Sequence, residues 1–228
     1  PASGWRELWR DAITDAGGSA LPVRADALNL SDIEKTVAEA VAHYGTVHIL
    51  INNVGGVGRF AAFEDLCDED WSGAFDLNVL SAVRFTRCSL PYMRRQRWGR
   101  IVNIASESGV QPDAEMPHYN CAKAAVIALG KSLSKACAAD GVLVNTVSPA
   151  FIRTPLVTDM MRGEAQRRGV GVDEAMAAFL RERRPHIELK RAGEESEVAK
   201  VVAFLASEAA SFVNGANYRV DGGSVASV

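Results

Sequence analysis

Short apolar runs alternate along this chain with longer stretches of helical periodicity, and no other feature constrains the fold as strongly. Five of these runs are expected to form strands: 20–25, 47–52, 100–105, 142–147 and 217–220. Residues 47–51 and 101–104 are largely apolar at consecutive positions, which is typical of strands that helices cover on both faces. The sequence therefore predicts an α/β fold built on a doubly wound parallel sheet.

Helical patterns fill the intervals between the expected strands. They cover residues 5–16, 31–44, 68–97, 116–139 and 195–207. Ser31 and Glu34 have the spacing of a capping box at the start of the second helix, and Gly45 is expected to end it. No linker, repeat or low-complexity segment separates these elements, so we expect a single domain over residues 1–228.

Residues 155–191 depart from this pattern because they are charged, helical in period, and interrupted by glycine and proline. They follow an expected strand end, where ligands bind in open α/β sheets. We therefore expect a substrate lid here, with a surface insertion of no function as the alternative. The apolar residues of the segment would suit an adaptable cover: Met160, Met161, Met176, Phe179 and Leu180.

The same segment is rich in arginine. The residues concerned are Arg162, Arg167, Arg168, Arg181, Arg183 and Arg184. One interpretation is that some of them recognise an anionic substrate or an acyl carrier. The other interpretation, which we favour, is that they lie on solvated helix faces.

Charge and cysteine spacing limit the partners that can be expected. The formal net charge is −3, which argues against general nucleic-acid binding because contact with phosphates requires a basic face. The cysteines have no zinc-ligand spacing, so we expect free thiols and no metal site; they are Cys67, Cys88, Cys121 and Cys137. The sequence shows neither a signal peptide nor an apolar run near the ~20 residues of a membrane span, so a soluble cytoplasmic protein is expected.

Three polar residues suggest chemistry. Tyr119 and Lys123 are four residues apart on an expected helix, so they share a face. A nearby ammonium favours the phenolate and lowers a tyrosine pKa, which makes Tyr119 a candidate general acid and base. Ser106 follows a buried strand, where its hydroxyl can donate a hydrogen bond to a carbonyl oxygen. The alternatives are a surface tyrosine beside a solvated lysine and a serine that begins a turn.

In this order and spacing, Ser106, Tyr119 and Lys123 resemble the catalytic residues of the short-chain dehydrogenase/reductase family, particularly its 3-oxoacyl-reductase-like branch. Other landmarks occur in the family's order. Residues 52–55 (Asn-Asn-Val-Gly) are similar to the NNAG segment, 149–154 to the PGxxxT segment, and 217–223 to the last strand and its exit. The resemblance runs from about residue 16 to the C-terminus, and it implies a Rossmann-like three-layer sandwich.

The resemblance also implies a function. It is the transfer of a hydride between the nicotinamide of NAD or NADP and a secondary alcohol or ketone. Tyr119 would exchange the proton with the substrate oxygen, Lys123 would hydrogen-bond the nicotinamide ribose, and Ser106 would polarise the carbonyl. Asn78 would hold a water in a proton relay to Lys123, or would merely kink the long helix. The expected cofactor contacts are Asp26, Ala27, Asn53, Val54, Gly55, Tyr119, Lys123, Pro149, Ile152 and Thr154.

Substrate, cofactor preference and assembly are less constrained. The resemblance allows 3-oxoacyl thioesters, sugars or polyols, and cyclic alcohols or steroids, and we favour a small or medium alcohol/ketone pair. The residues that would separate NAD from NADP are not in this sequence. A homotetramer or dimer is implied, pairing through residues 68–97 and 116–139. A non-catalytic dinucleotide-binding or scaffold protein is the alternative function, but a retired site would not need all four polar residues.

Three departures from the family pattern are substitutions, and one is an absence. Ala150 replaces the glycine of the PG pair, and Val54 replaces the alanine of NNAG. Ala105 replaces a serine that is common in the family but is not required for the chemistry. The TGxxxGxG turn, whose backbone amides bind a pyrophosphate, is not found, because Gly17 and Gly18 lack its spacing. We expect this N-terminal strand–helix unit to lie upstream of the sequence rather than to be deleted, since its strand is central in the family's sheet.

Overall fold

The computed structural model describes residues 3–227, and within them the four named strands form one sheet. They are β1 (Ile49–Asn52), β2 (Gly99–Ile104), β3 (Val142–Pro149) and β4 (Asn217–Val220). The strands lie side by side in sequence order, and every pair is parallel. The register places Ile101 beside both Leu50 and Val144. The predicted parallel α/β sheet is confirmed.

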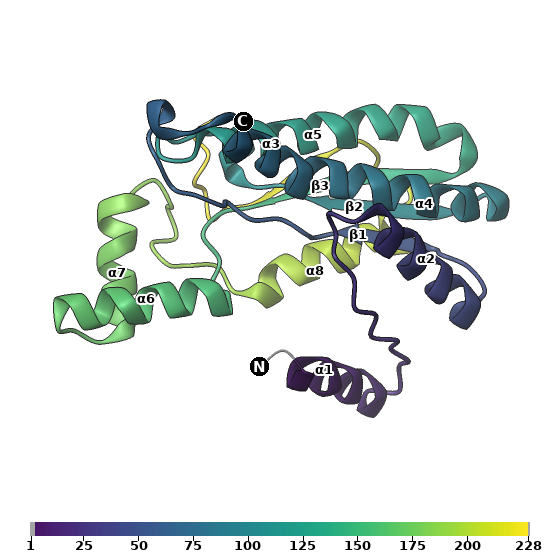
Figure 1. Cartoon of the computed structure of the whole chain (residues 1–228), viewed down its shortest axis with the longest axis horizontal. Helices are drawn as coiled ribbons and strands as arrows, with labels where there is room; N and C mark the ends of the chain where they lie inside the picture. The colour runs from purple at the N-terminus through teal and green to yellow at the C-terminus, as the bar shows by residue number, and fades with distance from the viewer. Residues whose placement is uncertain (1–2, 228) are drawn as a thin grey trace.

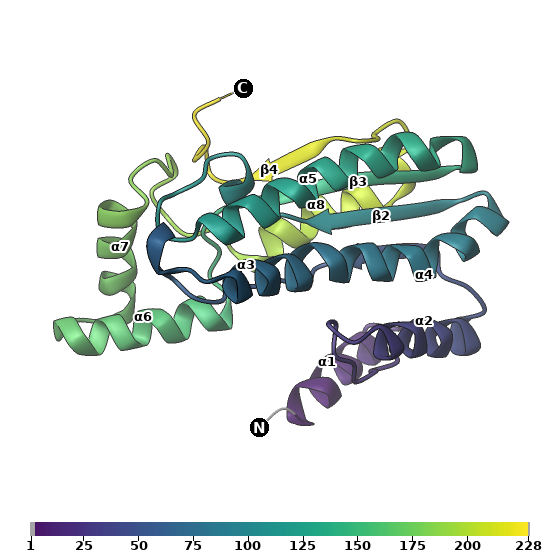
Figure 2. The ribbon, with the colours of Figure 1, turned by 45° about the horizontal axis from the view of Figure 1, so that its top comes forward.

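Helices cover both faces of this sheet (Figures 1 and 2). On one face lie α4 (Ser81–Gln96) and α5 (Pro117–Cys137), with Met93 packed against Ile101. On the other lies α8 (Glu195–Ala206), with Leu205 packed against Val102. Consecutive residues of β2 thus face opposite helical layers, which is why Ile101 and Val102 are both apolar and fully buried.

The remaining elements complete the described chain. They are α1 (Ser3–Asp15), α2 (Leu30–Tyr44), α3 (Asp68–Phe75), α6 (Pro155–Arg168) and α7 (Val172–Arg183). One π-helical turn spans Asp76–Leu80, and short 3-10 helices span Phe63–Asp65, Glu107–Gly109, Ala138–Asp140 and Glu208–Ala210. The π turn joins α3 to α4, so residues 68–97 follow one helical path as predicted, although not as a single α-helix.

The prediction of a strand at 20–25 is wrong. These residues have no regular structure and are mostly exposed. A strand requires a neighbour for its backbone groups, and no described strand lies beside this segment. β1 also differs from expectation: Ile49 is 43% and Ile51 is 38% exposed, since β1 is an edge strand of the described sheet.

The start of α2 is capped by a different residue from the one predicted. The side-chain oxygen of Asn29 accepts hydrogen bonds from the amides of Ser31 (2.9 Å) and Asp32 (3.4 Å). The helix therefore begins before Ser31, and the capping box expected from Ser31 and Glu34 is wrong. Its end agrees with the sequence, because Gly45 adopts a left-handed conformation with φ of 86°.

Helices α6 and α7 project from the end of the sheet toward which β2 points (Figures 1 and 2). Their apolar residues Met161, Met176 and Leu180 are buried against one another. The rings of Phe151 and Phe179 stack beside them with centroids 4.9 Å apart. The expected apolar cover is therefore largely the segment's own small core.

Candidate active site

The turn after β2 presents Ser106 at the carboxyl edge of the sheet. The Ser106 hydroxyl accepts a hydrogen bond from the Ser108 amide at 3.2 Å, which caps the 3-10 helix Glu107–Gly109. A Cβ on Gly109 would lie only 2.7 Å from the carbonyl carbon of Lys123. Because backbone atoms on both sides fix this distance, only glycine lets the turn approach helix α5 so closely. This approach brings Ser106 next to the residues of α5.

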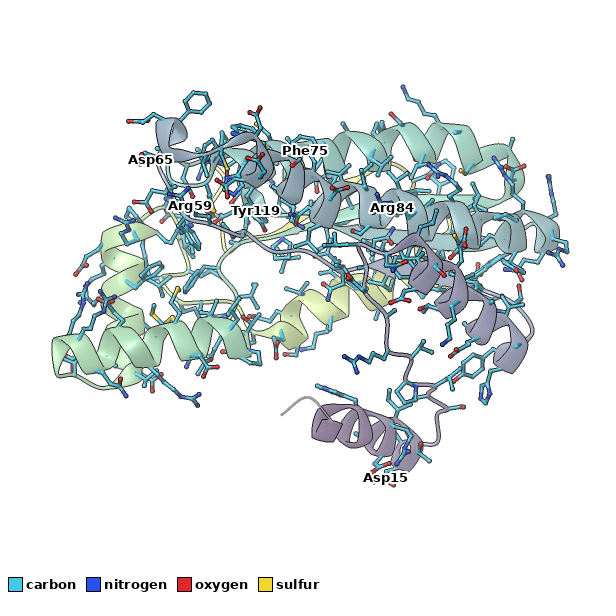
Figure 3. All side chains as sticks on the ribbon, in the orientation of Figure 1. Asp15, Arg59, Asp65, Phe75, Arg84 and Tyr119 are labelled. Carbon is cyan, nitrogen blue, oxygen red and sulfur yellow. The ribbon has the colours of Figure 1, made fainter. Side chains whose placement is uncertain are left out.

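Tyr119 lies on the first turn of α5, between Arg59 and Arg84 in the view of Figure 3. The Ser106 hydroxyl lies near enough to this phenol to favour its ionised form. Burial raises the pKa of Tyr119, while the Ser106 hydroxyl and the charge of Arg184 oppose this increase. The predicted serine–tyrosine pair is thus present in the structure.

Lys123 is 4% exposed, and its ammonium donates a hydrogen bond to the Ile104 carbonyl oxygen at 2.9 Å. The nitrogen lies 5.6 Å from the centre of the Tyr119 ring. Burial penalises the ammonium and lowers the pKa of Lys123 to about 8. The pKa of Tyr119 is raised because burial of the phenol outweighs the contacts that favour its ionised form, and the expectation that Lys123 lowers this pKa stays a prediction.

Asn78 lies in the π turn and is buried. Its amide nitrogen donates to the carbonyl oxygens of Gly56 and Ala74, both at 2.9 Å, and its oxygen accepts from the Gly56 amide at 3.1 Å. The bond to Ala74 satisfies a carbonyl at the irregular turn, as the kink interpretation requires. The bonds to Gly56 tie the loop after β1 to the helix, and one acceptor position of the oxygen is left for a water.

Gly55 joins these groups into one cluster. A Cβ at this position would lie 2.7 Å from the Asn78 side-chain oxygen and 2.9 Å from the Lys123 nitrogen. An ammonium has three donor hydrogens, and Ile104 takes one of those of Lys123. Two donors thus remain beside a backbone without a side chain, which suits the hydroxyl groups of a ribose.

The other expected cofactor residues divide into two sets. Asn53 and Val54 follow β1, and Pro149 ends β3, so all three lie at the carboxyl edge of the sheet. Thr154 caps α6 by accepting a hydrogen bond from the Val157 amide at 3.2 Å. Ile152 forms an isolated bridge with Gly193.

Asp26 and Ala27 form the second set. They lie in the loop before α2, where the Asp26 carboxylate accepts a hydrogen bond from the Leu28 amide at 2.9 Å. Arg84 of α4 donates to the Leu28 carbonyl at 3.2 Å and so ties this loop to the helical layer. Within the described residues, no hydrogen bond joins the loop to the catalytic cluster, so the contact of Asp26 and Ala27 with a cofactor stays a prediction.

The arginines of residues 155–191 are mostly paired with carboxylates. Arg162 pairs with Asp159, and Arg167 pairs with Glu164. Glu164 and Glu182 both contact Arg168. The last two reach the loop before α5: Arg183 pairs with Glu115, and Arg184 lies 3.2 Å from Asp113. This pairing supports the interpretation as charged helix faces.

Some residues that position this site received no role from the sequence. Gly109 and Gly56 hold the two loops against α5 and Asn78, and Glu107 is a carboxylate buried next to Ser106. A signal existed for Gly109, since it lies in an expected turn, where glycine permits a close approach of two backbone segments. Nothing in the sequence marked Glu107 as buried.

Comparison with known proteins decides the family. A family model described as enoyl-(acyl carrier protein) reductase matches residues 6–225. The uncharacterized oxidoreductase YvrD of Bacillus subtilis is 38% identical over 208 residues, which cover 90% of this chain and 79% of YvrD. The chain belongs to the short-chain dehydrogenase/reductase family. The resemblance seen in the sequence is confirmed.

Other members of the short-chain dehydrogenase/reductase family extend the comparison. The D-beta-hydroxybutyrate dehydrogenase of Cupriavidus necator is 34% identical over 202 residues, which are 89% of this chain and 77% of that enzyme. The structure of L-sorbose reductase from Gluconobacter frateurii, complexed with NADPH and L-sorbose, superposes with a TM-score of 0.92 at 28% identity. It covers 98% of this chain and 84% of the reductase chain.

Membership makes this short-chain dehydrogenase/reductase an NAD(P)-dependent oxidoreductase that acts on alcohol and carbonyl groups. The alternative of a non-catalytic protein has no support from these relatives. Residues 9–227, whose side chains the structure describes, contain no group of three or more His, Cys, Asp or Glu arranged to hold a metal ion. The four cysteines, all inside that range, are free. None of the helices that the structure describes is long and apolar enough to cross a bilayer.

Proposed function

We propose that Tyr119 is the general acid and base of this short-chain dehydrogenase/reductase, with Ser106, Lys123 and Asn78 completing the reaction centre. The observation that carries the proposal is the convergence of Ser106, Tyr119 and Lys123 at one edge of the sheet. The Ser106 hydroxyl lies near the Tyr119 phenol, and Lys123 is buried with its nitrogen 5.6 Å from the centre of the Tyr119 ring. Such a cluster of buried titratable groups with shifted pKa values is typical of an active site.

The bound nicotinamide supplies the hydride in reduction and accepts it in oxidation. Ser106 donates a hydrogen bond to the substrate oxygen, where negative charge develops during reduction. Tyr119 gives its proton to the same oxygen. Because burial keeps the pKa of Tyr119 above its ordinary value, the phenol is protonated at neutral pH and is ready to act as an acid.

Lys123 and Asn78 support this proton transfer. Lys123 is held by Ile104 and has two further donors, which would bind the hydroxyls of the nicotinamide ribose. Its positive charge near the phenol favours the phenolate that alcohol oxidation requires. The Asn78 side chain hydrogen-bonds both the amide and the carbonyl oxygen of Gly56. The side-chain oxygen of Asn78 has one further acceptor position, where we propose that a relay water binds.

The substrate that we propose is a small or medium, uncharged secondary alcohol or ketone. The pairing of lid arginines with carboxylates supports this choice, since a carboxylate partner neutralises most of the positive charge that would attract an anionic substrate. L-sorbose, named with the similar reductase structure, is such a substrate. An anionic hydroxy acid, as in D-beta-hydroxybutyrate dehydrogenase, would have to compete with Glu115 and Asp113 for Arg183 and Arg184.

The lid, assembly and location are proposals as well. The position of α6 and α7 beyond the carboxyl edge supports a lid at residues 155–191 within a single domain (Figure 1). A homotetramer or dimer that pairs through α4 and α5 rests on the family alone. Phe75, at 36% exposure, is available for such a contact, whereas Val126 is in the core. The free cysteines are consistent with a cytoplasmic location.

Steady-state kinetics would test the proposed function. Nicotinamide absorbance is followed with NADH and NADPH on a panel of ketoses, hydroxyketones, oxoacids and 3-oxoacyl thioesters, with Tyr119→Phe as the control. Turnover of an uncharged ketone that is lost in Tyr119→Phe supports the proposal. Tight coenzyme binding without turnover on any substrate would overturn it, and preference for oxoacids would overturn the substrate class alone.

A further inference from the structure

The turn that carries Ser106 is held on two sides, and the second contact comes from the far end of the chain. On one side Gly109 packs on α5 at Lys123. On the other, the hydroxyl of Ser224 donates a hydrogen bond to the carboxylate of Glu107. Ser224 follows β4 and is separated from Glu107 by 117 positions in the sequence.

A second residue of the same loop holds the same segment. The side-chain amide of Gln111 donates to the Ser224 carbonyl at 3.2 Å, and its oxygen accepts from the Ala226 amide, also at 3.2 Å. The segment is shaped by Asp221, whose carboxylate accepts from the amides of Gly223 and Val225 at 3.1 Å each. Residues 221–226 thus form an ordered strap across the turn that begins at Ser106.

The burial of this contact is unusual for its chemistry. Glu107 is 4% exposed and Ser224 is 1% exposed. A buried carboxylate costs free energy unless hydrogen bonds and charges compensate it, and an apolar side chain would fill the same space without that cost. The positive charge of Arg184 lies near Glu107, and the carboxylate of Asp221 faces it from the strap. The compensation is therefore built from the lid, the strap and the catalytic turn together.

We propose that Glu107 is a positioning residue, which holds Ser106 in its reactive orientation by clamping the strap through Ser224. This inference rests on the proposed role of Ser106. Glu107 is adjacent to Ser106 along the backbone, so movement of its side chain changes the direction of the serine hydroxyl. Without the clamp, the turn keeps its contact at Gly109 but loses its constraint on the other side. We expect reactive geometry to be lost before coenzyme binding, which Lys123 and Gly55 support.

The test compares Ser224→Ala, Glu107→Ala and Glu107→Gln with the wild-type protein. We expect kcat to fall about tenfold in Ser224→Ala and about thirtyfold in Glu107→Ala, because small misplacements of reacting groups cost up to about 100-fold. Glu107→Gln keeps the volume and one acceptor oxygen, so it should recover most of the activity. KM and the coenzyme Kd should stay within about twofold in all three variants, since the change is one of orientation.

A structural readout and a matched control accompany the kinetics. Hydrogen exchange at the amides of residues 224–226 should accelerate in Ser224→Ala and Glu107→Ala. Ser134→Ala is the control. It also removes a buried serine hydroxyl, which donates a hydrogen bond to the Lys131 carbonyl, but Ser134 lies three turns along α5 from Lys123. It should lower stability without changing kcat.

The outcomes separate the inference from the function on which it rests. Unchanged kcat in Ser224→Ala and Glu107→Ala, beside faster exchange of the strap, would show a purely structural contact and overturn the positioning role. Unchanged exchange would overturn the clamp itself. An inactive wild-type protein would instead overturn the proposed function, and the positioning role with it.

Discussion

The ammonium of Lys123 donates a 2.9 Å hydrogen bond to the carbonyl oxygen of Ile104, the last residue of β2. Ser106 follows Ile104 by two residues, and Tyr119 precedes Lys123 by one helical turn. A single bond therefore ties the helix that carries the acid to the strand that leads to the serine. Lys123 therefore has a structural role, which is to hold α5 against β2, in addition to its proposed chemical role.

The first prediction concerns stability and Lys123. Its pKa falls from 10.5 to about 8 on folding, so the unfolded chain binds more protons between these values. The wild-type protein should gain stability relative to Lys123→Met as the pH rises from about 8 to about 10.5. The gain should approach about 3 kcal/mol, since one pKa unit corresponds to about 1.4 kcal/mol. Urea unfolding of both proteins at several pH values measures it, and a difference that is constant with pH would contradict the prediction.

The second prediction concerns Tyr119. Replacement by phenylalanine removes the proton donor while leaving the ring and its packing. We expect kcat to fall about 100- to 10,000-fold, as general acid–base catalysis contributes this much. The coenzyme Kd, measured by fluorescence titration, should change little. Retention of more than a tenth of the activity would show that another group donates the proton.

The third prediction concerns the pH dependence of alcohol oxidation, which requires the phenolate of Tyr119. The charge of Arg184 lowers the Tyr119 pKa, so Arg184→Leu should raise it further. The rise of the oxidation rate with pH should therefore move to higher pH. Arg183→Leu is the control, since its guanidinium pairs with Glu115 and does not act on the phenol. Equal shifts of the pH profile in both variants would contradict the prediction, because the effect would then not be specific to Arg184.

The fourth prediction uses two adjacent glycines. A Cβ on Gly55 would lie 2.7 Å from the Asn78 oxygen and 2.9 Å from the Lys123 nitrogen, both of which are already held by hydrogen bonds. Gly55→Ala should cost about 1–3 kcal/mol of stability, as overpacking does, and should weaken coenzyme binding. Gly56→Ala is the control, because its Cβ would meet only Leu77 at an ordinary 3.5 Å. Denaturant unfolding and coenzyme titration would compare them, and equal losses would contradict the packing argument.

Much of the fold and of the site was predictable because the signals are local. The strands β1, β2 and β3 lie where the sequence has short runs of mainly apolar, β-branched residues. The last strand, 217–220, has its predicted bounds. The segment 20–25 shows the limit of this reasoning. Its composition suits a strand, but a strand exists only where a neighbour completes its hydrogen bonds, and none of the described strands does so.

The sequence by itself determined the parallel α/β sheet, the family, and the order of Ser106, Tyr119 and Lys123, since periodicity and spacing along the chain carry all three. Only the tertiary structure decided the chemistry of the groups. Spacing predicted that Lys123 would lower the Tyr119 pKa, whereas burial raises it. Likewise, Glu107 meets Ser224 across 117 positions. Desolvation and long-range contacts depend on what the folded chain places around a group, and no local pattern records that.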